Sequence, residues 1–170
     1  MRFKFLIAVV VAFFLGIGMA QAKLVVISIN KISQKMTVSV DGDREFVWPV
    51  STGVARFDTP SGSYRPFRME KEHFSLEWDD APMPNSIFFT GEGHAIHGSY
   101  HVKSLGRRAS HGCVRLAPEN AAKLFTLVEK VGMANTRVVV KGGLFDTELF
   151  RPGETSIPNR GFWKFIFKRE

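Results

Sequence analysis

The residues best suited to chemistry are a histidine and a cysteine, each next to a glycine. His97 is followed by Gly98, and Cys113, the only cysteine among the 170 residues, follows Gly112. A thiol is a good nucleophile only as a thiolate, and a nearby imidazole can take its proton. A histidine at the end of one strand can meet a cysteine on a neighbouring loop. We therefore expect His97 and Cys113 to act together.

Two neighbours of the cysteine extend this chemistry to acyl transfer. Gly112 leaves room for a substrate carbonyl to approach backbone N–H groups, which is what an oxyanion hole requires. Arg115, two residues after Cys113, offers a planar cation that fits a substrate carboxylate. The pattern indicates cysteine-dependent acyl transfer on a substrate that carries a carboxylate.

The segment Ser-His-Gly-Cys-Val-Arg-Leu at 110–116, preceded by Ile-His-Gly at 96–98, resembles the active-site signature of the L,D-transpeptidases, the YkuD domain family. Further matches in order are Val-Ser-Thr-Gly at 50–53, Thr-Pro-Ser-Gly at 59–62, and Met83-Pro84 leading to Phe88-Phe89. The resemblance covers about residues 24–141. Some branches of the family have a longer gap between the histidine and the serine of this signature, and some have an asparagine in place of Arg115. This chain is similar to the short-gap, arginine-bearing branch.

The resemblance implies roles for the two reactive residues. Cys113 is the nucleophile that becomes acylated, and His97 is its general base and later its general acid. The carbonyl of Gly98 orients the His97 ring. No metal and no organic cofactor are implied.

The resemblance also implies how the surrounding segment works. Backbone N–H groups around His111, Gly112 and Cys113 hold the oxyanion. Ser110 and His111 shape the pocket, and Arg115 binds or positions the peptide.

The implied reaction has two steps. Cys113 attacks the carbonyl of an L-centre in a peptidoglycan tetrapeptide stem, D-alanine leaves, and a thioester forms. An amine then accepts the acyl group, giving a 3→3 cross-link or an anchored envelope protein. The alternative is an L,D-carboxypeptidase or amidase that uses water, and a remote one is a wall-binding module without catalysis. Stem peptides, with an envelope protein as a further acceptor, are the expected partners, and nucleic acid is not.

A zinc site is the competing interpretation of the same region, with candidate ligands His94, His97, His101, His111 and Cys113. It is disfavoured because it leaves Gly112 and Arg115 unexplained. We expect His94 and His101 at the pocket rim or surface, and His73 as an ordinary surface histidine.

The elements that must position these residues are mostly strands. Alternating or β-branched runs predict strands at 23–29, 35–40, 45–50, 86–90, 94–97 and 137–141, with a turn leading into a strand at 59–64. One helix is predicted at 118–131, from an apolar stripe that begins after Pro118 and ends before Gly132. The expected fold is mainly β, a β-rich α+β, sandwich-like YkuD-type domain with its main helix after the cysteine.

The two ends of the chain suggest export and a tail. Residues 1–22 combine basic Arg2 and Lys4, an apolar run and Ala-Gln-Ala, which predicts a signal peptide cleaved after Ala22 and a periplasmic location. An unpaired cysteine in that oxidising compartment is inert and buried, paired to another chain, or reactive. The net charge of +7 suits anionic surroundings such as peptidoglycan. Residues 23–141 form the expected catalytic domain, and 142–170 a Gly/Pro-containing, aromatic-basic tail through which any membrane contact would occur.

Overall fold

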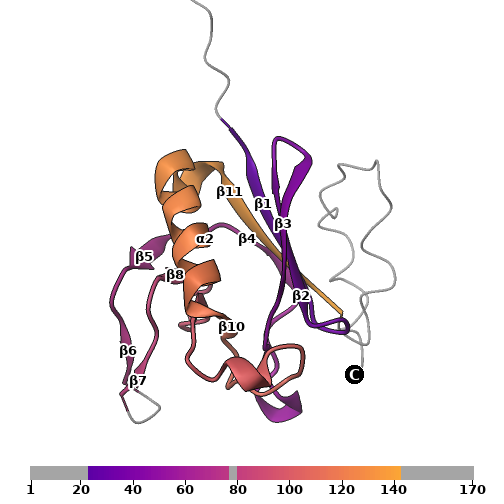
Figure 1. The fold of residues 1–170 in the computed structure, drawn as a ribbon, viewed down its shortest axis with the longest axis vertical. Coiled ribbons are helices and arrows are strands. Elements are labelled where there is room, and N and C mark those ends of the chain that lie inside the picture. The colour runs from indigo at the N-terminus through magenta and orange to yellow at the C-terminus, as the bar shows by residue number, and fades with distance from the viewer. Residues whose placement is uncertain (1–22, 77–79, 143–170) are drawn as a thin grey trace, which may run out of the picture.

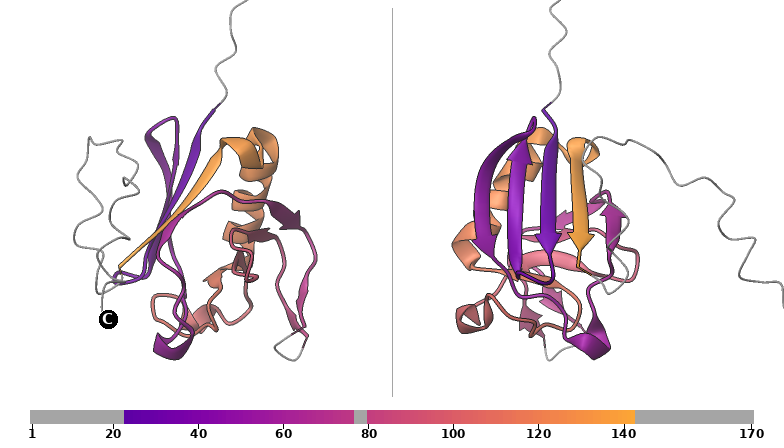
Figure 2. Two further views of the ribbon diagram at one scale, coloured as in Figure 1. Left: turned by 180° about the vertical axis from the view of Figure 1, so that it is seen from behind. Right: turned by 90° about the vertical axis from the view of Figure 1, so that its right-hand side faces the viewer.

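A five-stranded sheet, a four-stranded sheet, a two-stranded pair and one α-helix form the architecture of residues 23–76 and 80–142, which this computed structural model describes (Figure 1). The predicted signal peptide and nearly all of the predicted tail lie outside the described residues. Helix α2 (Pro118–Val131) and the smaller sheet lie on the same side of the larger sheet (Figure 2). The expectation of a mainly β fold, with its main helix after the cysteine, is confirmed.

The larger sheet has five strands in the order β3-β2-β1-β11-β4. Its strands are Val25–Asn30 (β1), Lys35–Val40 (β2), Asp43–Pro49 (β3), Gly62–Tyr64 (β4) and Thr136–Lys141 (β11). β1 runs parallel to β11, and the other pairs are antiparallel. Alternate side chains of β1 are buried, as the period of two predicts. The strands expected at both ends of the domain are confirmed, with ends shifted by no more than two residues.

The smaller sheet has four strands in the order β10-β9-β8-β5. Its strands are Arg68–Glu70 (β5), Ser86–Phe88 (β8), Ala95–Gly98 (β9) and Val114–Leu116 (β10). β9 and β10 are parallel, whereas β8 pairs antiparallel with both β9 and β5. Phe74–Ser75 (β6) and Ala81–Pro82 (β7) form a separate two-stranded pair. The strand expected at 86–90 ends at Phe88 because the chain turns there toward β9, and β5, β6, β7 and β10 were not predicted.

Helix α2 spans Pro118–Val131, which matches the predicted range. Its buried stripe is Ala121, Leu124, Phe125 and Val128, and it packs mainly on β9. These side chains share one hydrophobic core with residues of both sheets. Short 3₁₀ turns occur at Ala55–Phe57, Val102–Ser104 and Met133–Asn135. Among the described residues, no helix is long and apolar enough to cross a membrane.

Candidate active site

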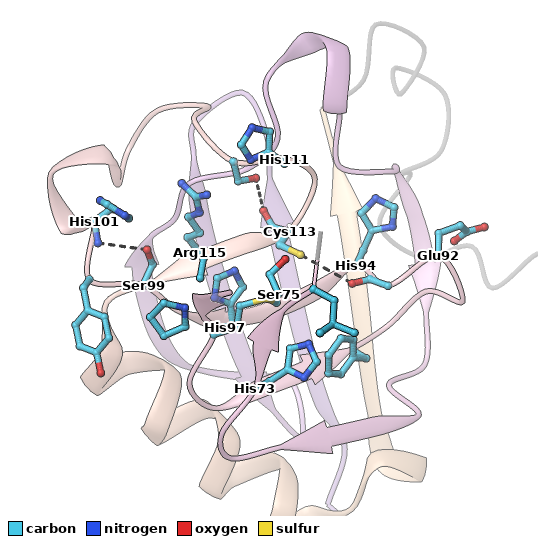
Figure 3. Close-up of a pocket in the computed structure, with 18 of the residues that line it drawn as sticks. His73, Ser75, Glu92, His94, His97, Ser99, His101, His111, Cys113 and Arg115 are labelled. Atoms are coloured by element: carbon cyan, nitrogen blue, oxygen red, sulfur yellow. Dashed lines mark hydrogen bonds between the residues drawn. The ribbon is translucent and has the colours of Figure 1, made fainter. Parts of the chain in front are cut away.

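A cavity of about 420 Å³ opens on the outer face of the four-stranded sheet (Figure 3). It is lined by the predicted site residues His97, Ser110, His111, Cys113 and Arg115 together with other side chains. The structure thus brings together all the side chains that the sequence singled out, although they come from segments on either side of a long loop.

Strand register explains why three of these side chains share one face. Arg115 of β10 lies directly opposite His97 of β9 in the parallel pair. Cys113 stands two residues before Arg115, so it projects on the same side, because side chains alternate along a strand. The intervening Val114 and its partner Ile96 point the other way and are buried in the core. Because the apolar residues of these strands face the core, the residues that alternate with them face the cavity.

His97 is held by a hydrogen bond that the resemblance implied. Its Nδ1 lies 2.8 Å from the Gly98 carbonyl oxygen. A carbonyl can only accept, so Nδ1 carries the hydrogen and Nε2 is left as the acceptor. Gly98 leaves no space for a side chain, since a Cβ there would lie 3.1–3.2 Å from atoms of Pro84 and Pro118.

The electrostatic setting keeps His97 neutral. Burial lowers the pKa of His97 to about 4, the Gly98 carbonyl opposes this, and electrostatic interactions with Arg115 and His73 act in the same direction as burial. At neutral pH the ring is therefore an uncharged base with Nε2 available to take a proton.

The cysteine loop is braced by Ser110. The Ser110 hydroxyl donates to the Cys113 carbonyl oxygen at 2.5 Å and accepts from the Gly112 N–H at 3.2 Å. In this structure the Gly112 N–H is thus engaged by Ser110, and an oxyanion role for it requires that bond to open. Ser110 stabilises the turn as well as lining the pocket.

Gly112 meets two separate constraints. Its φ of +113° is a conformation that side chains disfavour. A Cβ at this position would also lie 2.9 Å from Cδ2 of His94. His94 lines the cavity, is half-buried and has its Nδ1 2.7 Å from the Thr90 hydroxyl, so its imidazole is held against the loop.

Cys113 is half-buried, with its side chain packed against an apolar cluster of Met83, Phe88 and Ala95. Its Sγ lies 3.9 Å from the carbonyl oxygen of Gly93. The thiol therefore sits at the edge of the cavity with an apolar wall on one side.

Arg115 and His111 stand on the other side of the cysteine. Arg115 is half-buried and donates from Nη1 to the Ala109 carbonyl at 3.1 Å, and burial lowers its pKa while Cys113 opposes this. His111 is exposed and stacks edge-on against Phe57. Partial desolvation is the largest cause that lowers its pKa, and the positive charges of Arg115 and Arg56 act in the same direction.

The structure adds a buried threonine to the site. The Thr59 hydroxyl donates to the Gly112 carbonyl at 2.8 Å and accepts from the Gly53 N–H at 3.0 Å. Its own carbonyl accepts from the buried Lys31 ammonium, which also binds Asp58 at 2.6 Å. The Thr-Pro-Ser-Gly segment was noticed in the sequence, but nothing local indicated that its first residue reaches the cysteine loop.

Among the cavity residues that the sequence did not identify, His73 and Arg68 make specific contacts. His73, expected to be an ordinary surface histidine, lines the cavity, with Nδ1 2.6 Å from Glu70 and its ring edge-on to Phe88. Arg68 also lines the cavity, with its guanidinium carbon 3.7 Å from the centre of the Phe88 ring. Both depend on contacts between strands β5 and β8, which no local pattern predicted.

The zinc alternative gains no geometric support. Within 23–76 and 80–142, no three side chains of His, Cys, Asp or Glu are grouped so that they could hold a metal ion.

Comparison with known proteins places these features in a family. The model of the YkuD family, described as the L,D-transpeptidase catalytic domain, matches residues 23–140. A Bacillus subtilis (strain 168) protein, YqjB, whose name assigns it provisionally to the L,D-transpeptidases, is 25% identical over 124 residues, covering 66% of this chain and 68% of that protein.

Solved structures agree in fold. An L,D-transpeptidase from Mycobacterium tuberculosis H37Rv is 25% identical with a TM-score of 0.64, covering 71% of this chain and 58% of that one. An L,D-transpeptidase from Stackebrandtia nassauensis is 27% identical with a TM-score of 0.60, covering 79% of this chain and 59% of that one. The match thus spans less than two thirds of those solved chains.

Proposed function

The chain belongs to the YkuD family of L,D-transpeptidase catalytic domains, and from this premise we propose that it is a peptidoglycan L,D-transpeptidase with Cys113 as its nucleophile and His97 as its base. The observation that carries the proposal is a neutral imidazole, with Nε2 as acceptor, on the same sheet face and in the same cavity as the thiol. Such a pair can generate a thiolate at the moment of attack.

The first half-reaction forms a thioester. The Cys113 proton passes to Nε2 of His97 as the sulfur attacks the carbonyl of the L-centre before the terminal D-alanine. The protonated His97 then donates that proton to the departing amine, so D-alanine leaves and the acyl group stays on Cys113. Nearby backbone N–H groups, with that of Cys113 as the first candidate, stabilise the oxyanion, and Arg115 positions the peptide.

The second half-reaction transfers the acyl group. An acceptor amine loses a proton to His97 and attacks the thioester carbon, and the Cys113 sulfur leaves and is reprotonated. A stem amine gives a 3→3 cross-link, and a side-chain amine of an envelope protein gives an anchor. Water in place of the amine would make the enzyme an L,D-carboxypeptidase or an amidase.

Export belongs to the same proposal. We propose that residues 1–22 are a signal peptide, that 23–141 are the catalytic domain acting in the periplasm, and that 142–170 are an appended tail. The basic n-region, apolar run and Ala-Gln-Ala site support this assignment. Amino-terminal sequencing of the protein from the envelope fraction tests it, with a start at Lys23 expected.

The decisive experiment incubates the purified chain with tetrapeptide muropeptides and analyses the products by mass spectrometry. Cross-linked dimers and a covalent acyl adduct on Cys113 are expected. Tripeptides alone would identify water as the acceptor. The Cys113→Ala variant should form neither product, and its retained activity would overturn the mechanism.

A further inference from the structure

Arg68 and Cys113 stand at opposite ends of one row across the four-stranded sheet. Arg68 of β5 lies opposite Phe88 of β8, and Phe88 lies opposite Ala95 of β9. Extending the β9–β10 register by one residue from Val114 places Cys113 opposite Ala95. Directly paired residues project on the same face, so Arg68 and Cys113 look into the same cavity, which both of them line.

The head of Arg68 leans back over the row toward the cysteine. Its guanidinium carbon lies 3.7 Å from the centre of the Phe88 ring, a cation–π contact. Phe88 is buried and belongs to the apolar cluster against which Cys113 packs. The guanidinium therefore lies above β8, two strands away from β10. With neighbouring strands about 4.8 Å apart, this places the charge about 10 Å from the cysteine.

The guanidinium is oriented and still accessible. Glu70 contacts Nη1 of Arg68 through Oε1 at 3.4 Å, and the other oxygen of Glu70 holds His73 at 2.6 Å. The Arg68 side chain is 48% exposed. A guanidinium has five N–H donors in a planar fork that suits a carboxylate, and the Glu70 contact involves one terminal nitrogen.

We propose that Arg68 binds the terminal carboxylate of the amino acid that the enzyme releases, an inference that rests on the proposed function. In a tetrapeptide stem the attacked carbonyl and the terminal carboxylate are separated by one residue, about 3.8 Å. With about 3 Å from sulfur to the attacked carbon and a charge-assisted hydrogen bond at the far end, the span from Cys113 to a guanidinium is about 10 Å. This matches the placement of Arg68.

Arg115 is less suited to the same task. It lies two residues along β10 from Cys113 and directly opposite His97, outside the row that leads from Cys113 to Phe88, and its Nη1 donates to the Ala109 carbonyl. The row toward β5 therefore receives the leaving residue, and Arg115 faces the part of the stem that stays on the enzyme. Arg68 would make the enzyme select stems that end one residue after the attacked carbonyl.

The test pairs substrate and enzyme variants. The purified chain receives three stems: the free acid, its terminal carboxamide, and a stem that is amidated only at a side-chain carboxylate of the residue whose carbonyl is attacked. Release of the terminal residue and acylation of Cys113 are measured for wild type, Arg68→Gln and Arg68→Lys. Arg44→Gln, an exposed arginine on β3 of the other sheet, is the matched control.

For wild type and Arg44→Gln, kcat/KM for release of the terminal residue should be about 10- to 100-fold higher with the free acid than with the terminal carboxamide. This ratio is expected for the loss of one hydrogen bond to a charged group. Arg68→Gln should lower the free-acid rate to the carboxamide rate and leave the carboxamide rate unchanged. Arg68→Lys, which keeps the charge without the fork, should fall between.

The inference is overturned if Arg68→Gln still prefers the free acid to the terminal carboxamide, slows all stems equally, or changes only the response to the amidated side-chain carboxylate. Failure of wild type to acylate Cys113 with any stem would instead reject the proposed function, and the role of Arg68 with it. Far-UV circular dichroism of each variant separates these results from misfolding.

Discussion

At the scale of single residues, the site depends on the pairing of His97 with Arg115 across two neighbouring strands. The two residues are direct partners, so the charge of one acts on the ring of the other. Burial and that charge remove the proton from His97, and the Gly98 carbonyl sets which nitrogen remains to act as base. The histidine is thereby prepared as a neutral base before any substrate arrives.

The pH dependence of acylation follows from this setting. Only neutral His97 can accept the thiol proton, and its pKa of about 4 lies below the usual 6.5. Activity limited by this base should be full at pH 6 to 7 and fall only as the pH drops through about 4. The acidic limb of kcat/KM for acylation by a carbapenem measures it. A midpoint near 6.5 would contradict the assignment, and His97→Gln should be inactive throughout.

Gly112 has both a positive φ and a close contact with His94, and it can be compared with a glycine that has only the positive φ. Gly106 also has a positive φ, +89°, but a Cβ there would meet nothing within 4 Å. Gly106→Ala should lower the free energy of unfolding by about 1–2 kcal/mol and leave acylation intact. Gly112→Ala adds the clash with His94, so it should lose more stability and most of its acylation rate. Denaturant unfolding and mass spectrometry of the adduct make the comparison, and equal effects would argue against the clash.

At the scale of elements, the segment before Cys113 is held from outside the four-stranded sheet. Thr59 ties the Gly112 carbonyl to the Gly53 N–H, and it is fully buried. The peptide between Gly112 and Cys113 is planar and trans, so the Cys113 N–H points away from Thr59. The turn before β4 thus sets the direction of the backbone N–H of Cys113.

Removing only the Thr59 hydroxyl tests that tie. Thr59→Val keeps the shape but leaves a buried carbonyl and a buried N–H without their partner, so we expect the free energy of unfolding to fall by at least about 2 kcal/mol. Acylation per folded molecule should also slow, because the loop is less well oriented. Thr59→Ser restores the hydroxyl and should recover most of both. A Thr59→Val variant with normal acylation would show that the tie serves stability alone.

At the scale of the whole molecule, one hydrophobic core joins helix α2 to both sheets. Leu124 on the helix is fully buried in this core, and the helix packs on β9, the strand that carries His97. The outer face of the same small sheet carries the cavity. The four-stranded sheet therefore packs against the core on one face and carries the cavity on the other.

Leu124→Ala tests whether the core supports the site only through stability. The substitution should lower the free energy of unfolding by about 2–5 kcal/mol in a single cooperative transition, because it leaves a cavity. Lys123→Ala, on the exposed side of the helix, should change it by less than about 0.5 kcal/mol. Acylation per folded molecule should be unchanged in both. Separate transitions for the two sheets would refute the shared core.

Local patterns in the sequence were enough for much of this protein. Alternation, β-branched runs and turn signals over a few residues identified the strands of the larger sheet, and the spacing of three and four residues identified helix α2 with both of its ends. The family was recognisable from the segment around Cys113 together with Ile-His-Gly at 96–98. These features were readable because each depends on neighbours within a few positions along the chain.

Contacts distant in sequence decided the rest. Thr59 acts on Gly112 across 53 positions, and Arg68 faces the cavity only because β5 pairs with β8. The protonation state of His97 depends on burial by the folded chain, which no neighbour in the sequence supplies. Pairing and desolvation exist only once the strands have assembled. The sequence alone therefore determined which residues could react, and the tertiary structure decided how they are held, charged and surrounded.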